Sequence, residues 1–205
     1  MSNGAVIHLV DDDGSLRNAL QRLLGAAGYQ VRTYASAGEF LLQPPGDEPG
    51  CLLLDLRMPG PSGLELQESL QRHGITLPVV FLTGHGDLPT GVRAMKAGAV
   101  DFLTKPVERD VLLAAIARAL QMDAARRAHA AGDEELRSRY AGLTAREREV
   151  FRLIVAGKLN KQIGDALGIA ERTVKAQRAS VMTKLGATNA AELGRIAAEL
   201  RTVDP

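Results

Sequence analysis

The chain has 205 residues, 45% of them hydrophobic and 24% charged, which is the composition of one large or two small folded domains. The single cysteine, Cys51, excludes an intramolecular disulfide framework and a cysteine-based zinc site, and it favours a reducing compartment, so the predicted location is the cytoplasm. No apolar run approaches the ~20 residues of a membrane span, and 3% aromatic residues without tryptophan argue against a stacking surface for single-stranded nucleic acid.

The net charge of +1 conceals an asymmetry along the chain. Residues 1–122 hold 10 Lys/Arg and 13 Asp/Glu, a net charge of −3, whereas residues 123–205 hold 15 and 11, a net charge of +4. An acidic half joined to a basic half predicts two domains with different partners. The predicted division is a first domain over 1–122, a partly helical linker over 123–142 and a second domain over 143–205.

Short apolar segments and helical periodicity alternate through the first domain. Strands are predicted at 6–10, 30–34, 51–55, 77–83 and 100–104. A helical segment follows each strand, and the last is predicted over 107–120. This alternation predicts an α/β fold, a doubly wound five-stranded parallel sheet with helices on both faces.

The second domain has no strand signal. Helices are predicted at 144–155, 160–167, 172–185 and 190–200. Thr144 and Glu147 have the spacing of a capping box at the start of the first of these helices. The two short helices around Gly168-Ile-Ala170 have the dimensions of a helix-turn-helix, so a small all-α four-helix domain is expected.

Polar residues gather where the predicted strands end. Asp11 and Asp12 follow the first strand, Asp55 ends the third, Thr83 ends the fourth, and Lys105 follows the fifth. In an open parallel sheet, ligands bind at this edge. Clustered carboxylates require a cation, and hard oxygen ligands suit Mg²⁺. An aspartate can also act as a nucleophile toward phosphorus, with a lysine and a hydroxyl to stabilise the charge that develops.

Three other polar or reactive residues are predicted to have structural roles. Asp13 is expected to cap the helix that follows it. His8 and Cys51 lie within predicted strands and are expected to belong to the core.

The motifs of the first domain resemble those of the receiver domains of bacterial two-component response regulators, over residues 5–122. The matching motifs are Val10-Asp-Asp-Asp13, Leu54-Asp-Leu-Arg-Met-Pro-Gly60, Leu82-Thr-Gly-His-Gly-Asp87, Ala94-Met-Lys-Ala-Gly-Ala99 and Asp101-Phe-Leu-Thr-Lys-Pro106. The resemblance implies that Asp55 is the phosphoacceptor. The other roles that it implies are Mg²⁺ binding (with Mn²⁺ as a substitute) by Asp11, Asp12, Asp55 and the backbone carbonyl of Arg57, a phosphoryl contact by Lys105, switching by Thr83 and Phe102, and a cis peptide bond before Pro106.

The third helix of the second domain has one apolar and one polar face. When the helix is phased on Val174, Val181 and Leu185 fall on the same buried side. The outer face and its flank then carry Arg172, Lys175, Ala176, Ala179 and Thr183. Such a helix of basic and small residues can enter the major groove of DNA.

The second domain resembles the LuxR-type helix-turn-helix over residues 143–200, and the whole chain resembles FixJ-type response regulators. The matching motifs are Leu143-Thr-Ala-Arg-Glu-Arg-Glu-Val150, Asn160-Lys-Gln-Ile163, Leu167-Gly-Ile-Ala-Glu-Arg-Thr-Val-Lys175 and Lys184-Leu-Gly-Ala187. The resemblance implies base contacts by Lys175, Ala176 and Ala179. It implies backbone contacts by Asn160, Lys161, Thr173, Arg178 and Lys184.

Two details of the second domain depart from the simplest interpretation. Helical phase turns Arg178 inward, so an ion pair with Glu147 is the alternative to a phosphate contact. Ala170 stands where relatives often have serine, which predicts a recognition helix without its usual side-chain cap.

The leading hypothesis is a phosphorylation-controlled transcriptional regulator, an activator, that is no enzyme beyond Mg²⁺-dependent self-phosphorylation on Asp55. A sensor histidine kinase would donate the phosphoryl group, and the face formed by residues 88–120 would then support a homodimer. The dimer would bind double-stranded promoter DNA with RNA polymerase as a further partner, and no membrane is involved.

Two alternatives remain open at this stage. An aspartyl-phosphate hydrolase on a similar sheet would need a second acid after Asp55, and Leu56 and Arg57 stand there instead. A module that binds DNA or protein without phosphorylation would be indifferent to loss of Asp55.

Overall fold

A computed structural model describes residues 4–84 and 88–203. The chain divides into two compact units, Met1–Arg126 and Arg127–Pro205. Residues 85–87, which complete the motif after the fourth strand, lie outside the described residues.

The described part of the first unit contains one five-stranded parallel sheet in the order β2-β1-β3-β4-β5. Its strands are β1 (Val6–Val10), β2 (Gln30–Tyr34), β3 (Gly50–Asp55), β4 (Val79–Thr83) and β5 (Asp101–Thr104). Its helices are α1 (Gly14–Ala26), α2 (Ala37–Leu42), α3 (Gly63–Arg72), α4 (Leu88–Lys96) and the first part of α5 (Arg109–Ala141). The predicted doubly wound α/β fold is therefore confirmed.

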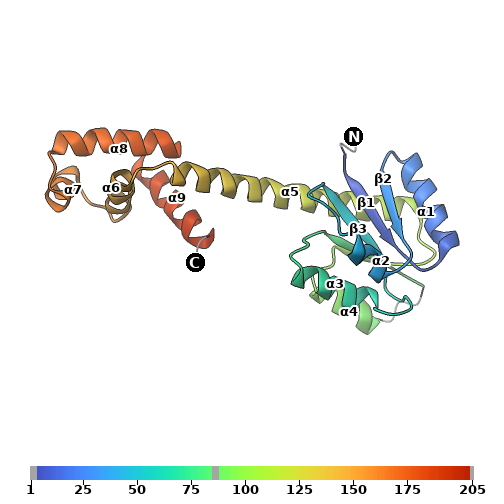
Figure 1. Cartoon of the computed structure of the whole chain (residues 1–205). Coiled ribbons are helices and arrows are strands. Elements are labelled where there is room, and N and C mark those ends of the chain that lie inside the picture. Colours follow the sequence, from blue (N-terminus) through green and yellow to red (C-terminus); the bar gives the residue numbers. More distant parts are fainter. Residues whose placement is uncertain (1–3, 85–87, 204–205) are drawn as a thin grey trace. The chain divides into compact units, whose positions relative to one another are not determined.

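The sheet has a hydrophobic core on each face because successive side chains along a strand point to opposite sides. On one face, Leu54 and Phe81 belong to the cluster that includes residues of α2, α3 and α4. On the other face, Leu53 and Leu82 belong to the cluster that includes residues of α1 and α5. Figure 1 shows the helices on the two faces of the sheet. Strands buried on both faces explain why β3 and β4 read as continuous apolar runs.

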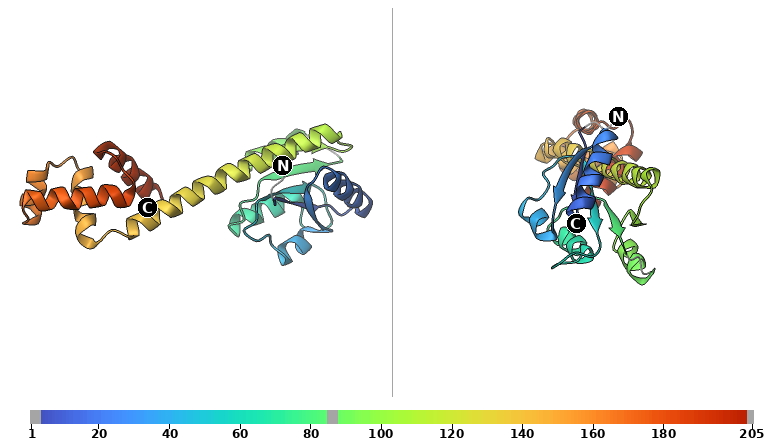
Figure 2. Two further views of the ribbon diagram at one scale, coloured as in Figure 1. Left: turned by 90° about the horizontal axis from the view of Figure 1, so that it is seen from above. Right: turned by 90° about the vertical axis from the view of Figure 1, so that its right-hand side faces the viewer.

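Helix α5 is longer than the sequence pattern predicts. It runs without interruption over Arg109–Ala141, through the segment expected to be a partly helical linker, and Figure 2 shows it as one continuous ribbon. Alanine, arginine and glutamate are strong helix formers, and the single Gly132 costs only about 1 kcal/mol. The buried Asp123 accepts hydrogen bonds from the backbone N–H of Gly50 at 3.0 Å and from Arg126 at 2.6 Å. The first compact unit therefore continues past the predicted boundary at residue 122.

Two glutamines connect α3 to the end of α4. The side-chain amides of Gln67 and Gln71 each donate to the carbonyl oxygen of Ala97 at 3.1 Å. Gln67 is buried. The carbonyl just beyond the last turn of α4 is thus held from the side by α3.

The polar residues with predicted structural roles have them. Asp13 accepts hydrogen bonds from the backbone N–H groups of Ser15 and Leu16 and caps α1. His8 is fully buried; its Nδ1 and the hydroxyl of Tyr34 lie 3.0 Å apart. Burial, assisted by the nearby Arg32, lowers the pKa of His8 to about 4. Burial likewise raises the pKa of the Cys51 thiol to about 12.

The second unit is helical throughout its described elements. After the last turns of α5 come α6 (Ala145–Val155), α7 (Asn160–Leu167), α8 (Glu171–Leu185) and α9 (Ala190–Val203). Gly168 ends α7 in the left-handed conformation, with φ 64°, which a residue with a Cβ rarely adopts. The turn leads directly into α8, and Val174, Val181 and Leu185 of α8 are buried in the common core. The predicted four-helix arrangement is confirmed.

Candidate functional site

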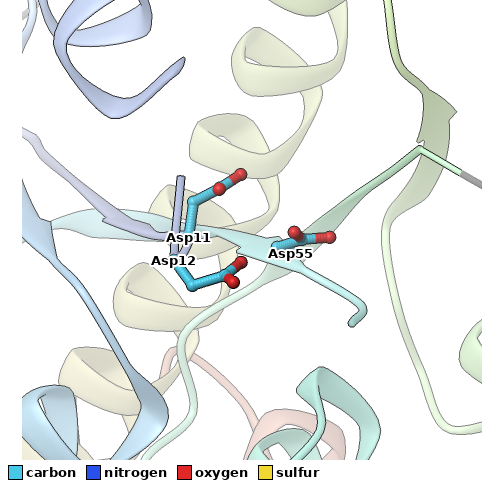
Figure 3. A group of neighbouring side chains, drawn as sticks. All are labelled: Asp11, Asp12 and Asp55. Carbon is cyan, nitrogen blue, oxygen red and sulfur yellow. The ribbon is translucent and has the colours of Figure 1, made fainter. Parts of the chain in front are cut away.

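Three carboxylates meet where β1 and β3 end. Asp11 and Asp12 follow β1, and Asp55 is the last residue of the neighbouring β3. One oxygen of each lies within 4.8 Å of the others, and Figure 3 shows the three side chains gathered at this edge of the sheet. Asp11 and Asp55 are buried, whereas Asp12 is exposed. This donor set fits a hard divalent cation such as Mg²⁺.

The loop after β3 is packed tightly against Asp55. Gly63 opens α3 and donates its backbone N–H to the carbonyl of Leu56 at 3.0 Å. A Cβ at Gly63 would lie 2.3 Å from the carbonyl oxygen of Asp55. Only glycine therefore fits at this position, and the close packing fixes the backbone of Asp55.

Lys105 supplies the positive charge at this edge. Its Nζ lies 2.6 Å from Oδ2 of Asp11 and 2.9 Å from Oδ2 of Asp55. The predicted cis peptide bond between Lys105 and Pro106 is present. Burial alone would lower the pKa of Lys105, but the hydrogen bonds to Asp11 and Asp55 outweigh it and raise the pKa. Burial raises the pKa of Asp11, against the opposing effect of Lys105.

Thr83 and Phe102 lie on the adjacent strands β4 and β5. Thr83 is fully buried at the end of β4, and its carbonyl accepts the N–H of Lys105 at 2.7 Å. The partly buried ring of Phe102 lies 6.5 Å from that of Phe81. A Cβ at Gly91 of α4 would lie 3.4 Å from the Phe102 ring. The aromatic residue therefore contacts the backbone of α4.

Sequence reasoning missed Arg17. Its guanidinium donates to the carbonyl oxygen of Asp11 at 2.5 Å and so holds the backbone of the acidic cluster from α1. The backbone N–H of Arg57 donates to Oδ1 of Asp55 at 3.3 Å. Arg17 lies one turn after the Asp13 cap, and that spacing is the only signal in the sequence that could have indicated it.

The outer face of α8 is exposed as its helical phase predicts. The exposed residues include Arg172, Thr173, Lys175, Ala176, Ala179 and Thr183. Lys161, in the first turn of α7, is also exposed. Ala170 provides no side-chain cap to α8, as expected. Small and basic side chains thus form one accessible surface of the second unit.

Four of the predicted DNA-contacting residues have partners within the protein, namely Asn160, Lys175, Arg178 and Lys184; Lys175 lies 3.6 Å from Glu171 of the same helix. Arg178 donates to Oδ1 of Asn160 at 3.4 Å. Lys184 lies 2.7 Å from Oε2 of the buried Glu147, and the hydroxyl of Ser180 donates to Oε1 of Glu147 at 2.6 Å. The alternative that Arg178 pairs with Glu147 is therefore wrong, because Lys184 and Ser180 occupy that carboxylate.

The comparisons with known proteins agree with this geometry. Residues 7–117 match the family model described as the response regulator receiver domain. Residues 141–197 match the model of bacterial regulatory proteins of the luxR family.

Similar full-length proteins include nodulation protein W of Bradyrhizobium diazoefficiens, 43% identical over 97% of this chain and 88% of that protein. The transcriptional regulatory protein FixJ of Azorhizobium caulinodans is 42% identical over 96% of this chain and 93% of its own length. Among solved structures, response regulator StyR is 45% identical, with a TM-score of 0.85 over 96% of this chain and all of that one. Full-length FixJ from B. japonicum is 39% identical, with a TM-score of 0.60 over 98% of this chain and 99% of that one.

The fold and the acidic edge define a receiver domain that is followed by a helix-turn-helix DNA-binding domain. The chain belongs to the response regulators with a LuxR-type output domain, and it is a phosphorylation-controlled, DNA-binding transcriptional regulator. A receiver domain implies a histidine kinase as its partner. Among the described residues, no helix is both long enough and apolar enough to cross a bilayer.

Proposed function

We propose that Asp55 is the phosphoacceptor of this regulator and that phosphorylation makes it a dimeric activator. The observation that carries the proposal is the position of the Lys105 ammonium, which lies within 2.9 Å of carboxylate oxygens of both Asp11 and Asp55. Asp55 stands among other carboxylates at the edge of the sheet and beside a lysine, and these are the groups that phosphoryl transfer needs.

The transfer balances with a phosphohistidine of the kinase as donor. An Oδ of Asp55 forms the new bond to phosphorus, and the phosphorus–nitrogen bond to the imidazole breaks. The imidazole nitrogen keeps the electron pair and takes up a proton. Lys105 and the Thr83 hydroxyl would then contact phosphoryl oxygens, so that the added negative charge has donors at the ends of the two neighbouring strands β4 and β5.

Asp11, Asp12 and Asp55, with the backbone carbonyl of Arg57, would hold Mg²⁺ or Mn²⁺. Such an ion would supply positive charge to offset the carboxylates and the incoming phosphoryl group. Lys105 cannot neutralise the site alone, because one ammonium faces two buried carboxylates and the exposed Asp12 lies beside them. Arg17 positions the cluster through the Asp11 carbonyl.

The dimer would form through α4, β5 and the first turns of α5. Apolar side chains are exposed on these helices, with Val92 at 45%, Met95 at 47% and Val111 at 50%. On the same face Arg118 forms an ion pair with Asp101. Movement of Thr83 toward the phosphoryl group and repacking of Phe102, which contacts α4 at Gly91, would change this face.

The paired output domains would then bind half-sites about one helical turn of DNA apart. Lys175, Ala176 and Ala179 are proposed to face the bases, and Asn160, Lys161, Thr173, Arg178 and Lys184 to contact the backbone. Lys184 would have to serve both Glu147 and phosphate. RNA polymerase is the proposed further partner, and the cytoplasm the proposed location.

The test measures mass in solution and binding to a pool of promoter fragments, with Mg²⁺ and with or without beryllofluoride as a phosphoryl mimic. In the parent protein the mimic should shift monomer to dimer and tighten DNA binding. In Asp55→Ala the mimic should change neither the mass in solution nor the affinity for DNA. DNA binding that is the same in all conditions would refute control by phosphorylation, and turnover of phosphate esters without accumulation of phosphoprotein would favour a hydrolase.

A further inference from the structure

The second unit contains a groove on a side that the proposed DNA contacts do not use. It has a volume of about 580 Å³ and lies among the last turns of α5, α6 and α9. Its apolar and aromatic lining, which we call its floor, includes Tyr140, Phe151, Val155 and Leu200. None of the described residues that line it belongs to α7 or α8. We call it the Arg148 groove.

The rim of the Arg148 groove is basic. Arg148 and Arg152 line it, and so does Arg137, which forms an ion pair with Glu134 at 3.5 Å; among its described lining residues there is no aspartate or glutamate. Arg148 and Arg152 are four residues apart and therefore lie on the same side of α6. Arg152 is exposed. A surface with an apolar floor and the guanidinium groups of Arg148 and Arg152 on one side of α6 favours a partner that carries both apolar and acidic side chains.

Arg148 is held in position before any partner arrives. Its Nη2 donates to the carbonyl oxygen of Ala141 at 2.9 Å, and its guanidinium carbon lies 5.6 Å from the centre of the Tyr140 ring. Its Nε is buried and has no hydrogen-bond partner. An arginine that is already ordered loses less side-chain entropy when it binds a carboxylate.

We propose that the Arg148 groove binds an amphipathic helix of a partner protein, with apolar residues on the floor and flanking Asp or Glu side chains on the arginines. This mode of recognition requires an apolar groove and anchors at helical spacing. A second copy of this chain fits poorly, because a twofold contact would place the arginines of one groove against those of the other. The inference is independent of Asp55 and of the DNA-binding face.

The experiment uses the full-length protein and a synthetic four-turn peptide with leucines and one tryptophan on one face and glutamates beside them. The protein has no tryptophan, so the emission of the peptide alone reports binding. A peptide of the same composition, reordered so that it has no apolar face, is the control. Both peptides are measured with and without Mg²⁺ and beryllofluoride, and binding in either state supports the proposal.

Charge reversal locates the site. The variant Arg148→Glu/Arg152→Glu should weaken peptide binding at least about tenfold and leave promoter binding unchanged. Arg172→Glu, on the exposed face of α8, should weaken promoter binding and leave peptide binding unchanged. Arg152→Lys keeps the charge and should retain peptide binding. Because Arg152 is exposed, Arg152→Glu alone is the substitute if the double variant does not fold by circular dichroism.

Three results would overturn the proposal. They are equal binding of the reordered peptide, peptide affinity that ignores the reversed charges, and loss of promoter binding in the groove variants, which would make these arginines a DNA contact. Failure of the parent protein to bind promoter DNA in any condition would count against the proposed function instead.

Discussion

Each unit of the molecule contains a lysine bonded to buried carboxylate, and the two clusters are built differently. In the first unit Lys105 is shared between Asp11 and Asp55, with Asp12 beside them. In the second unit Lys184 pairs with one carboxylate, that of Glu147, and also donates to the carbonyl oxygen of Gly142 at 3.4 Å. Glu147 also accepts hydrogen bonds from the Ser180 hydroxyl and from the backbone N–H of Thr144.

The pKa values of the two acids are shifted in opposite directions, by hydrogen bonds in Glu147 and by burial in Asp11. Hydrogen bonds from Lys184, then from Ser180 and the Thr144 backbone, lower the pKa of Glu147 to about 2. Burial raises the pKa of Asp11 although Lys105 opposes it. The cluster of Glu147 is complete and stabilises the fold, whereas the cluster of Asp11 retains excess negative charge that a cation would neutralise.

The largest expected effect on stability comes from Glu147→Ala. It leaves Ser180 without its acceptor and Lys184 without its carboxylate partner, and it should lower the free energy of unfolding of the second unit by about 2–4 kcal/mol. The loss is smaller than for a fully buried pair because the Lys184 side chain is 39% exposed. Hydrogen exchange of α6 and α8 measures the change. Glu149→Ala is the matched control, because its ion pair with Arg146 at 2.7 Å is on the surface and contributes less than about 1 kcal/mol.

The contribution of Glu147 to the stability of the second unit should be lost only at acidic pH. The pKa of Glu147 is lowered from 4.5 to about 2, so its stabilisation is fully present above pH 4.5 and is lost as the pH falls through about 2. The difference between parent and Glu147→Ala should therefore shrink only in that range. A difference already lost at pH 5 would show that the carboxylate charge is not what stabilises the unit.

His8 extends the comparison to a buried group with no opposite charge bonded to it. Its pKa is lowered from 6.5 to about 4. Burial is the main cause, the positive charge of Arg32 lowers the pKa further, and the negative charge of Glu48 raises it. Because the unfolded chain takes up the proton more readily, the first unit should lose about 2–3 kcal/mol of stability as the pH falls from 6.5 to 4. Hydrogen exchange of β1 and β3 measures this loss. In His8→Leu the pH dependence over this interval should disappear, and its persistence would assign it to other groups.

The smallest effect on stability is expected for Asp11→Asn, which tests the contrast directly. Removing excess buried charge should change the free energy of unfolding of the first unit by less than about 1 kcal/mol. The Mg²⁺ concentration needed for the beryllofluoride response should nevertheless rise at least about tenfold. A loss of stability as large as that of Glu147→Ala would show that the two clusters do not differ in the way described.

Much of this arrangement follows from local sequence patterns. The order of strands and helices, the positions of Asp11, Asp12 and Asp55 at strand ends, and the exposed face of α8 depend on periodicity and on residues near in the chain. The contacts that could not be predicted join distant residues through long side chains. Lys184 reaches Glu147 across 37 positions, and Asp123 reaches the start of β3 across 73. Helical phase gives the side of a helix on which such a residue lies, but not the partner that it reaches.

The two glutamine bonds to Ala97 restrict the way in which α4 can respond to a change at Thr83. Both bonds hold the chain just beyond the last turn of the helix. Because both donors belong to α3, a displacement of α4 relative to α3 that preserves these bonds keeps the Ala97 end of the helix in place and moves its other end. In such a motion Gly91, which lies beside Phe102, is displaced farther than Lys96, which is next to the fixed Ala97.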